Sequence, residues 1–153
     1  MSDNRLVFSF MQPIYRIGIC AHWPLIRFIV GMNLIPHGYR KLFGGSVEKT
    51  AAAFGKIDFP FPFDLFSSLS LTYVVAVTEF FGGILIIVGL LTRLAAAAAT
   101  ILLATAVYVL FHQGFFWNDH GYEYPLLWGG VCLAIFFRGG GPFSLDSILS
   151  KEL

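Results

Sequence analysis

One stretch of the sequence constrains the fold more than any other, because Leu65 to Thr92 contains a single charged residue, Glu79. A helix needs about 20 apolar residues to cross the hydrocarbon core of a bilayer. The stretch therefore predicts a membrane-spanning helix with a carboxylate near its middle. A carboxylate at that depth costs roughly 2.5–3.5 kcal/mol on insertion scales. We expect Glu79 to be protonated, or paired with a basic residue of another helix.

The residues that share a helical face with Glu79 are small or polar, which indicates that this face is turned inward. They are Thr72, Ala76, Gly82, Gly83 and Ile86. Small residues let neighbouring helices approach one another closely in a membrane. The segment is therefore predicted to present Glu79 to other helices and not to lipid.

The composition is that of an integral membrane protein. The 153 residues are 57% hydrophobic and 12% charged, whereas a soluble protein carries about 25% charged residues. The net charge of +1 and the lack of a basic tail argue against nucleic-acid binding. We expect one membrane domain without a separate soluble domain. No phosphate-binding loop, dinucleotide fingerprint, nucleophile elbow or zinc motif is present, which argues against a self-contained enzyme of the soluble type.

The apolar runs predict an all-α fold, a transmembrane four-helix bundle. We expect spans at about residues 23–43, 65–91, 94–116 and 121–138, an interfacial N-terminal segment at 5–21 and an outer loop at 44–64. The N-terminal segment alternates aromatic and polar residues, which is typical of a segment on the membrane surface; a loosely ordered tail is the alternative. The fourth span is short, so Glu123 is expected to be drawn below the interface.

Smaller features refine this arrangement. Ser46 to Gly55 are expected to form a short helix in the outer loop, and the stretch Phe59 to Phe63 to cap the bundle or lie on the membrane surface. Ser144 is expected to cap a short surface helix. The two cysteines, Cys20 and Cys132, are interpreted as small buried hydrophobic residues, with a redox pair as the alternative.

Four spans place both termini on one side of the membrane. That side would hold Arg5, Arg16, Arg27, Arg93, Arg138 and Lys151, and the other side Arg40, Lys41, Lys49 and Lys56. Basic residues are more frequent in cytoplasmic segments. The bias favours cytoplasmic termini.

Polar residues recur at helical spacing on two of the predicted spans. Asn33, His37 and Lys41 follow one another at four-residue intervals, and Thr105, Tyr108 and His112 share a face of the third span. At 1.5 Å per residue, His37 lies about 21 Å and His112 about 27 Å from the cytoplasmic side. We therefore expect His37, Lys41, His112 and Glu123 to line one cavity in the outer half of the bundle. Arg40 or Lys41 is expected to neutralise Glu79 or Glu123. The alternative is that these polar residues bond one another without open space.

Several blocks of the sequence, taken together, resemble the DoxX family. They are HGYRKLFGG (His37 to Gly45), TEFFGGILIIVGLLTRLAA (Thr78 to Ala96), HQGFF (His112 to Phe116) with Glu123, and GPFSLD (Gly141 to Asp146). The family pattern matches at His37, Lys41, Glu79, Arg93, His112 and Glu123. The resemblance implies a small four-helix protein of a bacterial-type inner membrane. It also implies a link, known for some members, to quinol oxidation, thiosulfate:quinone oxidoreduction or membrane redox complexes. The N-terminus is longer and more aromatic than a minimal member needs.

Three functions remain open at this point. The first is a quinone site formed by His37, Lys41, Glu79, Tyr108, His112 and Glu123, in a subunit of a redox complex, with no metal and no covalent cofactor. The second is a non-catalytic structural or anchoring subunit of a larger membrane enzyme. The third is a bis-histidine haem between His37 and His112, which their depth difference of about 6 Å disfavours. A transport role is a further alternative. We expect membrane lipids and another protein subunit as partners.

Overall fold

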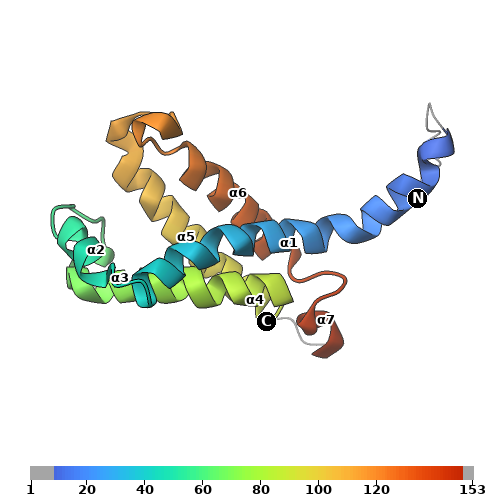
Figure 1. The fold of residues 1–153 in the computed structure, drawn as a ribbon, viewed down its shortest axis with the longest axis horizontal. Helices are drawn as coiled ribbons and strands as arrows, with labels where there is room; N and C mark the ends of the chain where they lie inside the picture. Colours follow the sequence, from blue (N-terminus) through green and yellow to red (C-terminus); the bar gives the residue numbers. More distant parts are fainter. Residues whose placement is uncertain (1–8, 150–153) are drawn as a thin grey trace.

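The structure is a computed structural model that describes residues 9–149, and this part of the chain is helical and contains no strand. The helices are α1 (Gln12–Leu42), α2 (Val47–Phe54), α3 (Ser68–Val77), α4 (Gly83–Val88), α5 (Thr92–Leu110), α6 (Glu123–Arg138) and α7 (Leu145–Leu149). A π-helical turn, Thr78–Gly82, joins α3 to α4, and short 3₁₀ turns cover Ser9–Met11, Phe63–Leu65, Phe111–Gln113 and Trp117–Asp119. The predicted all-α fold is confirmed (Figure 1).

Three helical stretches in the described residues are long and apolar enough to cross a membrane. They are Gln12–Leu42, Ser68–Val88 and Thr92–Gln113. With 16 residues, α6 is shorter than the length of about 20 residues that a crossing needs. A fourth crossing, and with it the complete four-helix bundle, stays a prediction.

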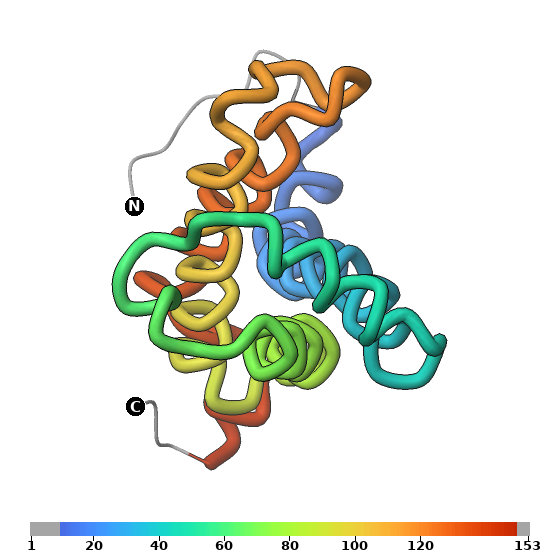
Figure 2. Tube along the Cα trace, turned by 90° about the vertical axis from the view of Figure 1, so that its left-hand side faces the viewer, coloured from blue at the N-terminus to red at the C-terminus, as the bar shows by residue number. Residues whose placement is uncertain are grey.

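The long helices form two pairs. α1 packs against α3, the π turn and α4, while α5 packs against α6. The two pairs meet through α4 and α5 and then diverge, so that α5 and α6 point away from α1 (Figures 1 and 2). The buried apolar core lies where the pairs meet and contains Trp23, Val30, Leu34, Ile86, Ala95, Ala96, Ala99, Cys132 and Ile135.

Glycines allow α1 to lie directly against the second membrane helix. A Cβ atom on Gly83 would come within 3.1 Å of the Gly31 carbonyl oxygen, and one on Gly38 within 2.7 Å of the Ala76 carbonyl oxygen. The face predicted to turn inward is therefore confirmed. All its members are buried, namely Thr72, Ala76, Glu79, Gly82, Gly83 and Ile86.

One end of the molecule is closed by the segment that follows α6. The Asp146 carboxylate accepts hydrogen bonds from the Leu91 amide (2.8 Å), the Thr92 amide (2.9 Å) and the Thr92 hydroxyl (2.6 Å). Arg27 donates to the Phe143 carbonyl over 2.7 Å, and the Trp23 indole to the Gly139 carbonyl over 3.0 Å. We call this region, formed by Trp23, Arg27, Leu91, Thr92 and residues 139–146, the closed end.

The closed end bears on two predictions. Ser144 accepts a hydrogen bond from the Ser147 amide (3.1 Å), so its predicted role as a helix cap is confirmed. Trp23, the predicted start of the first span, lies beside Gly139, which follows α6. The two lie at the same end of the molecule, as an even number of crossings requires. Which side of the membrane this end faces stays a prediction.

The N-terminal part of the chain bears on two expectations. Part of the predicted interfacial segment, residues 5–8, lies outside the described residues. Its remainder forms the 3₁₀ turn Ser9–Met11 and the first turns of α1, which is continuous from Gln12 to Leu42. Whether it lies on the membrane surface stays a prediction. The expectation that Cys20 is buried is wrong, whereas Cys132 is buried as predicted. Cys20 is exposed because the first turns of α1 extend beyond the helices that pack against it (Figure 1).

Candidate functional site

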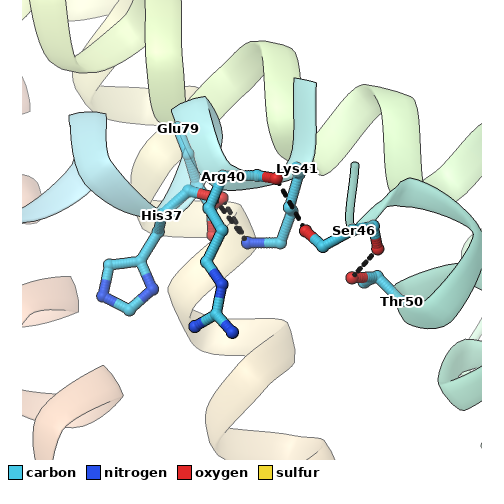
Figure 3. Close-up of polar contacts among 6 residues, drawn as sticks. All are labelled: His37, Arg40, Lys41, Ser46, Thr50 and Glu79. Atoms are coloured by element: carbon cyan, nitrogen blue, oxygen red, sulfur yellow. Dashed lines mark hydrogen bonds and ion pairs between the residues drawn. The ribbon is translucent and has the colours of Figure 1, made fainter. Parts of the chain in front are cut away.

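Glu79 is buried between helices and forms an ion pair with Lys41. The Lys41 ammonium lies 2.5 Å from a Glu79 carboxylate oxygen, and the two side chains are only 15% and 10% exposed. Lys41 also donates to the His37 carbonyl at 3.4 Å (Figure 3). The expectation that Glu79 is buried and paired is confirmed, and of the two proposed partners the structure selects Lys41.

Local structure brings the two charges together. Lys41 lies on the last turn of α1, and Gly38, one turn earlier, lets α1 approach Ala76 closely. Glu79 lies in the π-helical turn Thr78–Gly82. Such turns insert one extra residue into an α-helix and occur frequently at functional sites. Pairing lowers the cost of holding each charge at membrane depth.

The ion pair forms part of the wall of a cavity of about 500 Å³ between α3 and α5. Lys41 and Glu79 are its charged residues, and the side chains of Thr78 and Thr105 are its other polar groups. The remaining lining is apolar: Phe54, Ile57, Phe59, Phe63, Leu71, Val74, Val75, Ala98, Ile101, Leu102, Ala106, Val109 and Leu110. We call this space the apolar cavity.

A second hollow lies between the end of α1 and α2. It has a volume of about 450 Å³ and is lined by Pro36, His37, Arg40, Lys41, Ser46, Lys49, Thr50 and Ala53. We call it the cationic groove, since its charged residues are basic. Lys41 lines both hollows and so marks the place where they adjoin.

The remaining predicted site residues, His37, Tyr108, His112 and Glu123, do not line the apolar cavity. His37 is exposed and lines the cationic groove. Tyr108 is 57% exposed and His112 is exposed, and neither lines the apolar cavity. Glu123, at the start of α6, accepts a hydrogen bond from the Trp117 amide over 3.1 Å.

This arrangement corrects the expectation of one shared cavity for His37, Lys41, His112 and Glu123. Of these four residues, only Lys41 lines the apolar cavity. Residues at equal depth lie close together only where the helices run nearly parallel. Because the α5–α6 pair diverges from α1 (Figure 1), residues at similar depth lie apart. Whether any of the predicted residues bind a quinone stays a prediction.

Part of the cavity wall was not identified as functional from the sequence. Thr78, which precedes Glu79, is half-buried and lines the cavity. Phe59 and Phe63 belong to the stretch expected to cap the bundle or lie on the membrane surface, and both line the cavity. The apolar side chains and prolines of that stretch had indicated a rigid segment that covers the bundle or the membrane surface, but not that it lines a cavity.

Comparison with known proteins identifies the family. The sequence profile of the DoxX family matches residues 22–113, which is more than half of the chain. The chain belongs to the DoxX family. The matched region includes His37, Lys41, Glu79, Tyr108 and His112 and ends before Glu123. Together with the three membrane-length helices, family membership makes this a membrane protein.

Two relatives extend the comparison. A Haemophilus influenzae protein named "Uncharacterized protein" is 35% identical over 94 residues, covering 61% of this DoxX-family chain and 62% of that relative. A Bacillus subtilis protein named "Putative oxidoreductase CatD" is 30% identical over 127 residues, covering 83% of this chain and 86% of that relative. No solved structure matches the chain.

Proposed function

We propose that this chain is the membrane subunit of a quinone-linked redox complex and that the apolar cavity holds the quinone. One observation carries the proposal: the Lys41–Glu79 ion pair forms a charged wall of an otherwise apolar cavity of about 500 Å³. The word oxidoreductase in the name of the Bacillus subtilis relative supports a redox role.

The residues of the cavity fit a quinone. Its volume lies in the range of about 300–1,000 Å³ that is typical of ligand pockets. A quinone ring has two carbonyl oxygens that accept hydrogen bonds, and the Lys41 ammonium and Thr78 hydroxyl are donors. Phe59 and Phe63 supply apolar surface for the ring or its prenyl tail. A bound quinone would supply two-electron redox chemistry coupled to the transfer of two protons.

Each member of the ion pair has a distinct role in this proposal. Lys41 orients one quinone carbonyl by donating a hydrogen bond. Glu79 holds the Lys41 ammonium in place, since the two groups lie 2.5 Å apart. As a carboxylate, Glu79 is also the group at the cavity wall that can accept a proton.

A structural or anchoring subunit is the second candidate function. The observation in its favour is that Lys41 and Glu79 already neutralise each other's charge and share a hydrogen bond. In that case the pair would only link α1 to the second membrane helix, and a partner enzyme would carry the chemistry.

Filling the cavity separates the two candidates. Ala106 lines the apolar cavity, whereas Ala104 is exposed on the same helix and does not. The detergent-solubilised chain is titrated calorimetrically with a short-tailed ubiquinone analogue and with menadione. We expect Ala106→Phe to weaken binding by about ten-fold or more, because the ring occupies the ligand's space. Ala104→Phe is the matched control and should bind as the wild type. If the wild type binds neither compound, or Ala106→Phe binds as tightly as the wild type, the structural function is favoured.

We further propose a bacterial-type cytoplasmic membrane, with the closed end facing the cytoplasm. The basis is the basic residues at that end, Arg27, Arg93 and Arg138, since basic residues favour the cytoplasmic side. In spheroplasts, an impermeant thiol reagent should label Ser46→Cys and leave Ser147→Cys unlabelled, in a Cys20→Ser background. The opposite labelling would reverse the orientation.

A further inference from the structure

The cationic groove presents more positive charge than the protein itself neutralises. Its lining includes His37, Arg40, Lys41 and Lys49, and no carboxylate among the described residues lines it. Glu79 compensates Lys41 from the side of the apolar cavity. Neither Arg40 nor Lys49 has an ion-pair partner within residues 9–149. The groove therefore retains two uncompensated charges on facing elements, one from α1 and one from α2.

The groove is held in shape by its own hydroxyl groups. The Ser46 hydroxyl donates to the Arg40 carbonyl over 2.7 Å, and the Thr50 hydroxyl donates to the Ser46 carbonyl over 2.8 Å. The first bond ties the start of α2 to the end of α1, and the second lies within the first turn of α2. The Arg40 guanidinium and the His37 ring extend to the same side of α1 (Figure 3), and neither group forms a hydrogen bond or ion pair within residues 9–149. The free donors of the groove are therefore cationic or imidazole nitrogens.

Such donors are suited to a phosphate. The guanidinium of an arginine binds phosphate oxygens through two parallel hydrogen bonds, and a lysine adds a point charge. The groove also lies at the end of a membrane-length helix. At the same end of α1, Tyr39 and Phe43 are 56% and 61% exposed, and their rings contact Phe80 in tilted and edge-on geometry. Exposed aromatic rings of this kind gather at the level of the lipid head groups. At this level of the membrane, the anion next to the cationic groove is the phosphate of a lipid head group.

We propose that the cationic groove binds the phosphate of an anionic membrane lipid, with Arg40 and Lys49 as the contacting residues. The bound lipid stabilises the contact between α1 and α2 and so fixes the segment that covers the apolar cavity. This site goes beyond the proposed quinone function and does not depend on it.

The test compares two lysines of the same loop region. Lys49 lines the groove, whereas Lys56 is exposed and lines neither hollow. Thermal unfolding of the detergent-solubilised chain is followed while phosphatidylglycerol, phosphatidylcholine or sodium phosphate is added at constant ionic strength. The dependence of the unfolding midpoint on ligand concentration gives an apparent dissociation constant.

We expect phosphatidylglycerol to raise the unfolding midpoint more than phosphatidylcholine does. Lys49→Gln should weaken the binding of phosphatidylglycerol by about five-fold, since each basic residue near an anionic lipid surface contributes about 1 kcal/mol. Arg40→Gln should weaken it at least as much. Lys56→Gln removes the same charge and should leave the apparent dissociation constant unchanged. Because Arg40 and Lys49 are exposed, the lipid-free variants should unfold at the wild-type midpoint.

Three results would overturn the proposal. The first is equal stabilisation by phosphatidylglycerol and phosphatidylcholine, which would show that the groove does not distinguish an anionic head group from a zwitterionic one. The second is an equal effect of Lys49→Gln and Lys56→Gln, which would show a diffuse attraction without a site. The third is stabilisation by sodium phosphate as large as that by phosphatidylglycerol, with the same sensitivity to Lys49→Gln. That result would assign the groove to free phosphate and not to a lipid.

Discussion

Two basic residues of α1 face carboxylates from later parts of the chain, and their surroundings differ. At the closed end Arg27 is 1% exposed, and the space around it is filled. A Cβ atom added to Gly89 would come within 2.9 Å of the Ser144 Cα, and one added to Gly140 within 3.0 Å of the Thr92 hydroxyl. At the other end of α1, Lys41 and Glu79 lie between hollows of about 500 and 450 Å³.

The difference shows how charged groups in a membrane protein can be assigned to a structural role or to a ligand-binding role. Where neighbouring atoms crowd the charged groups, as around Arg27 and Asp146, which attract one another without a direct ion pair, the charges hold segments together. Where open volume adjoins the two residues, as at Lys41 and Glu79, a ligand has room to lie beside them. Burial alone does not separate the two cases, because the carboxylates of both pairs are buried.

The largest expected effect comes from removing the carboxylate of the closed end. Asp146→Ala leaves the donors of Leu91 and Thr92 without their acceptor and Arg27 without a compensating charge. We expect the free energy of unfolding to fall by about 4 kcal/mol, measured by denaturant titration in detergent. Asp64→Ala, at an exposed position, is the control. Equal losses in the two variants would show that the closed end does not anchor the fold.

A double-mutant cycle at the cavity should give a different pattern. Lys41→Met or Glu79→Leu alone leaves one uncompensated charge and should cost about 3 kcal/mol of unfolding free energy. The double variant removes both charges and should come within about 1 kcal/mol of the wild type. It should nevertheless lose the binding of quinone analogues. If the double variant binds the quinone analogues as well as the wild type does, the ion pair is not part of the binding site.

The smallest expected effect is a pH dependence at the closed end. Burial raises the pKa of Asp146, but hydrogen bonds from Thr92 and Leu91 and the charge of Arg27 outweigh it, so the pKa lies below its ordinary value. A lowered folded-state pKa stabilises the protein above the unfolded-state pKa of about 3.9. This contribution is lost as the pH falls through the folded-state pKa.

The matched variant for this measurement is Asp146→Asn, which keeps the shape and cannot titrate. Between about pH 6 and pH 3, the unfolding midpoint of the wild type should fall more steeply than that of Asp146→Asn. Parallel curves would show that Asp146 does not contribute to the acid sensitivity.

The sequence predicted the parts of the fold that follow from one helix at a time. Apolar length identified three membrane helices, and the small residues around Glu79 identified its buried face, because both depend only on helical periodicity. The divergence of the α5–α6 pair from α1 depends on the angles at which the helices cross. That crossing is set by contacts between segments distant in sequence, so the separation of Lys41 from His112 and Glu123 could not be read from spacing.

The choice of partner for Glu79 shows the same limit. Arg40 and Lys41 are adjacent in sequence but point about 100° apart around a helix. Which of them reaches Glu79 is decided by the rotation of α1 against α3, which the close approach of Gly38 to Ala76 fixes. The apolar cavity was also beyond prediction, because its walls come from α1, α2, α3, the π turn, α5 and the loop between α2 and α3.

The length of α1 has a consequence for how the protein lies in the bilayer. Its 31 residues form a rod of about 46 Å, and the hydrocarbon core is about 30 Å thick. Even at a tilt of about 40°, the steep limit for membrane helices, the rod is too long to be immersed completely. At a common tilt of about 20°, about ten residues leave the hydrocarbon, which is the length of the stretch from Gln12 to Ala21. Hydrophobic mismatch thus divides one unbroken helix into a submerged part and an emergent part.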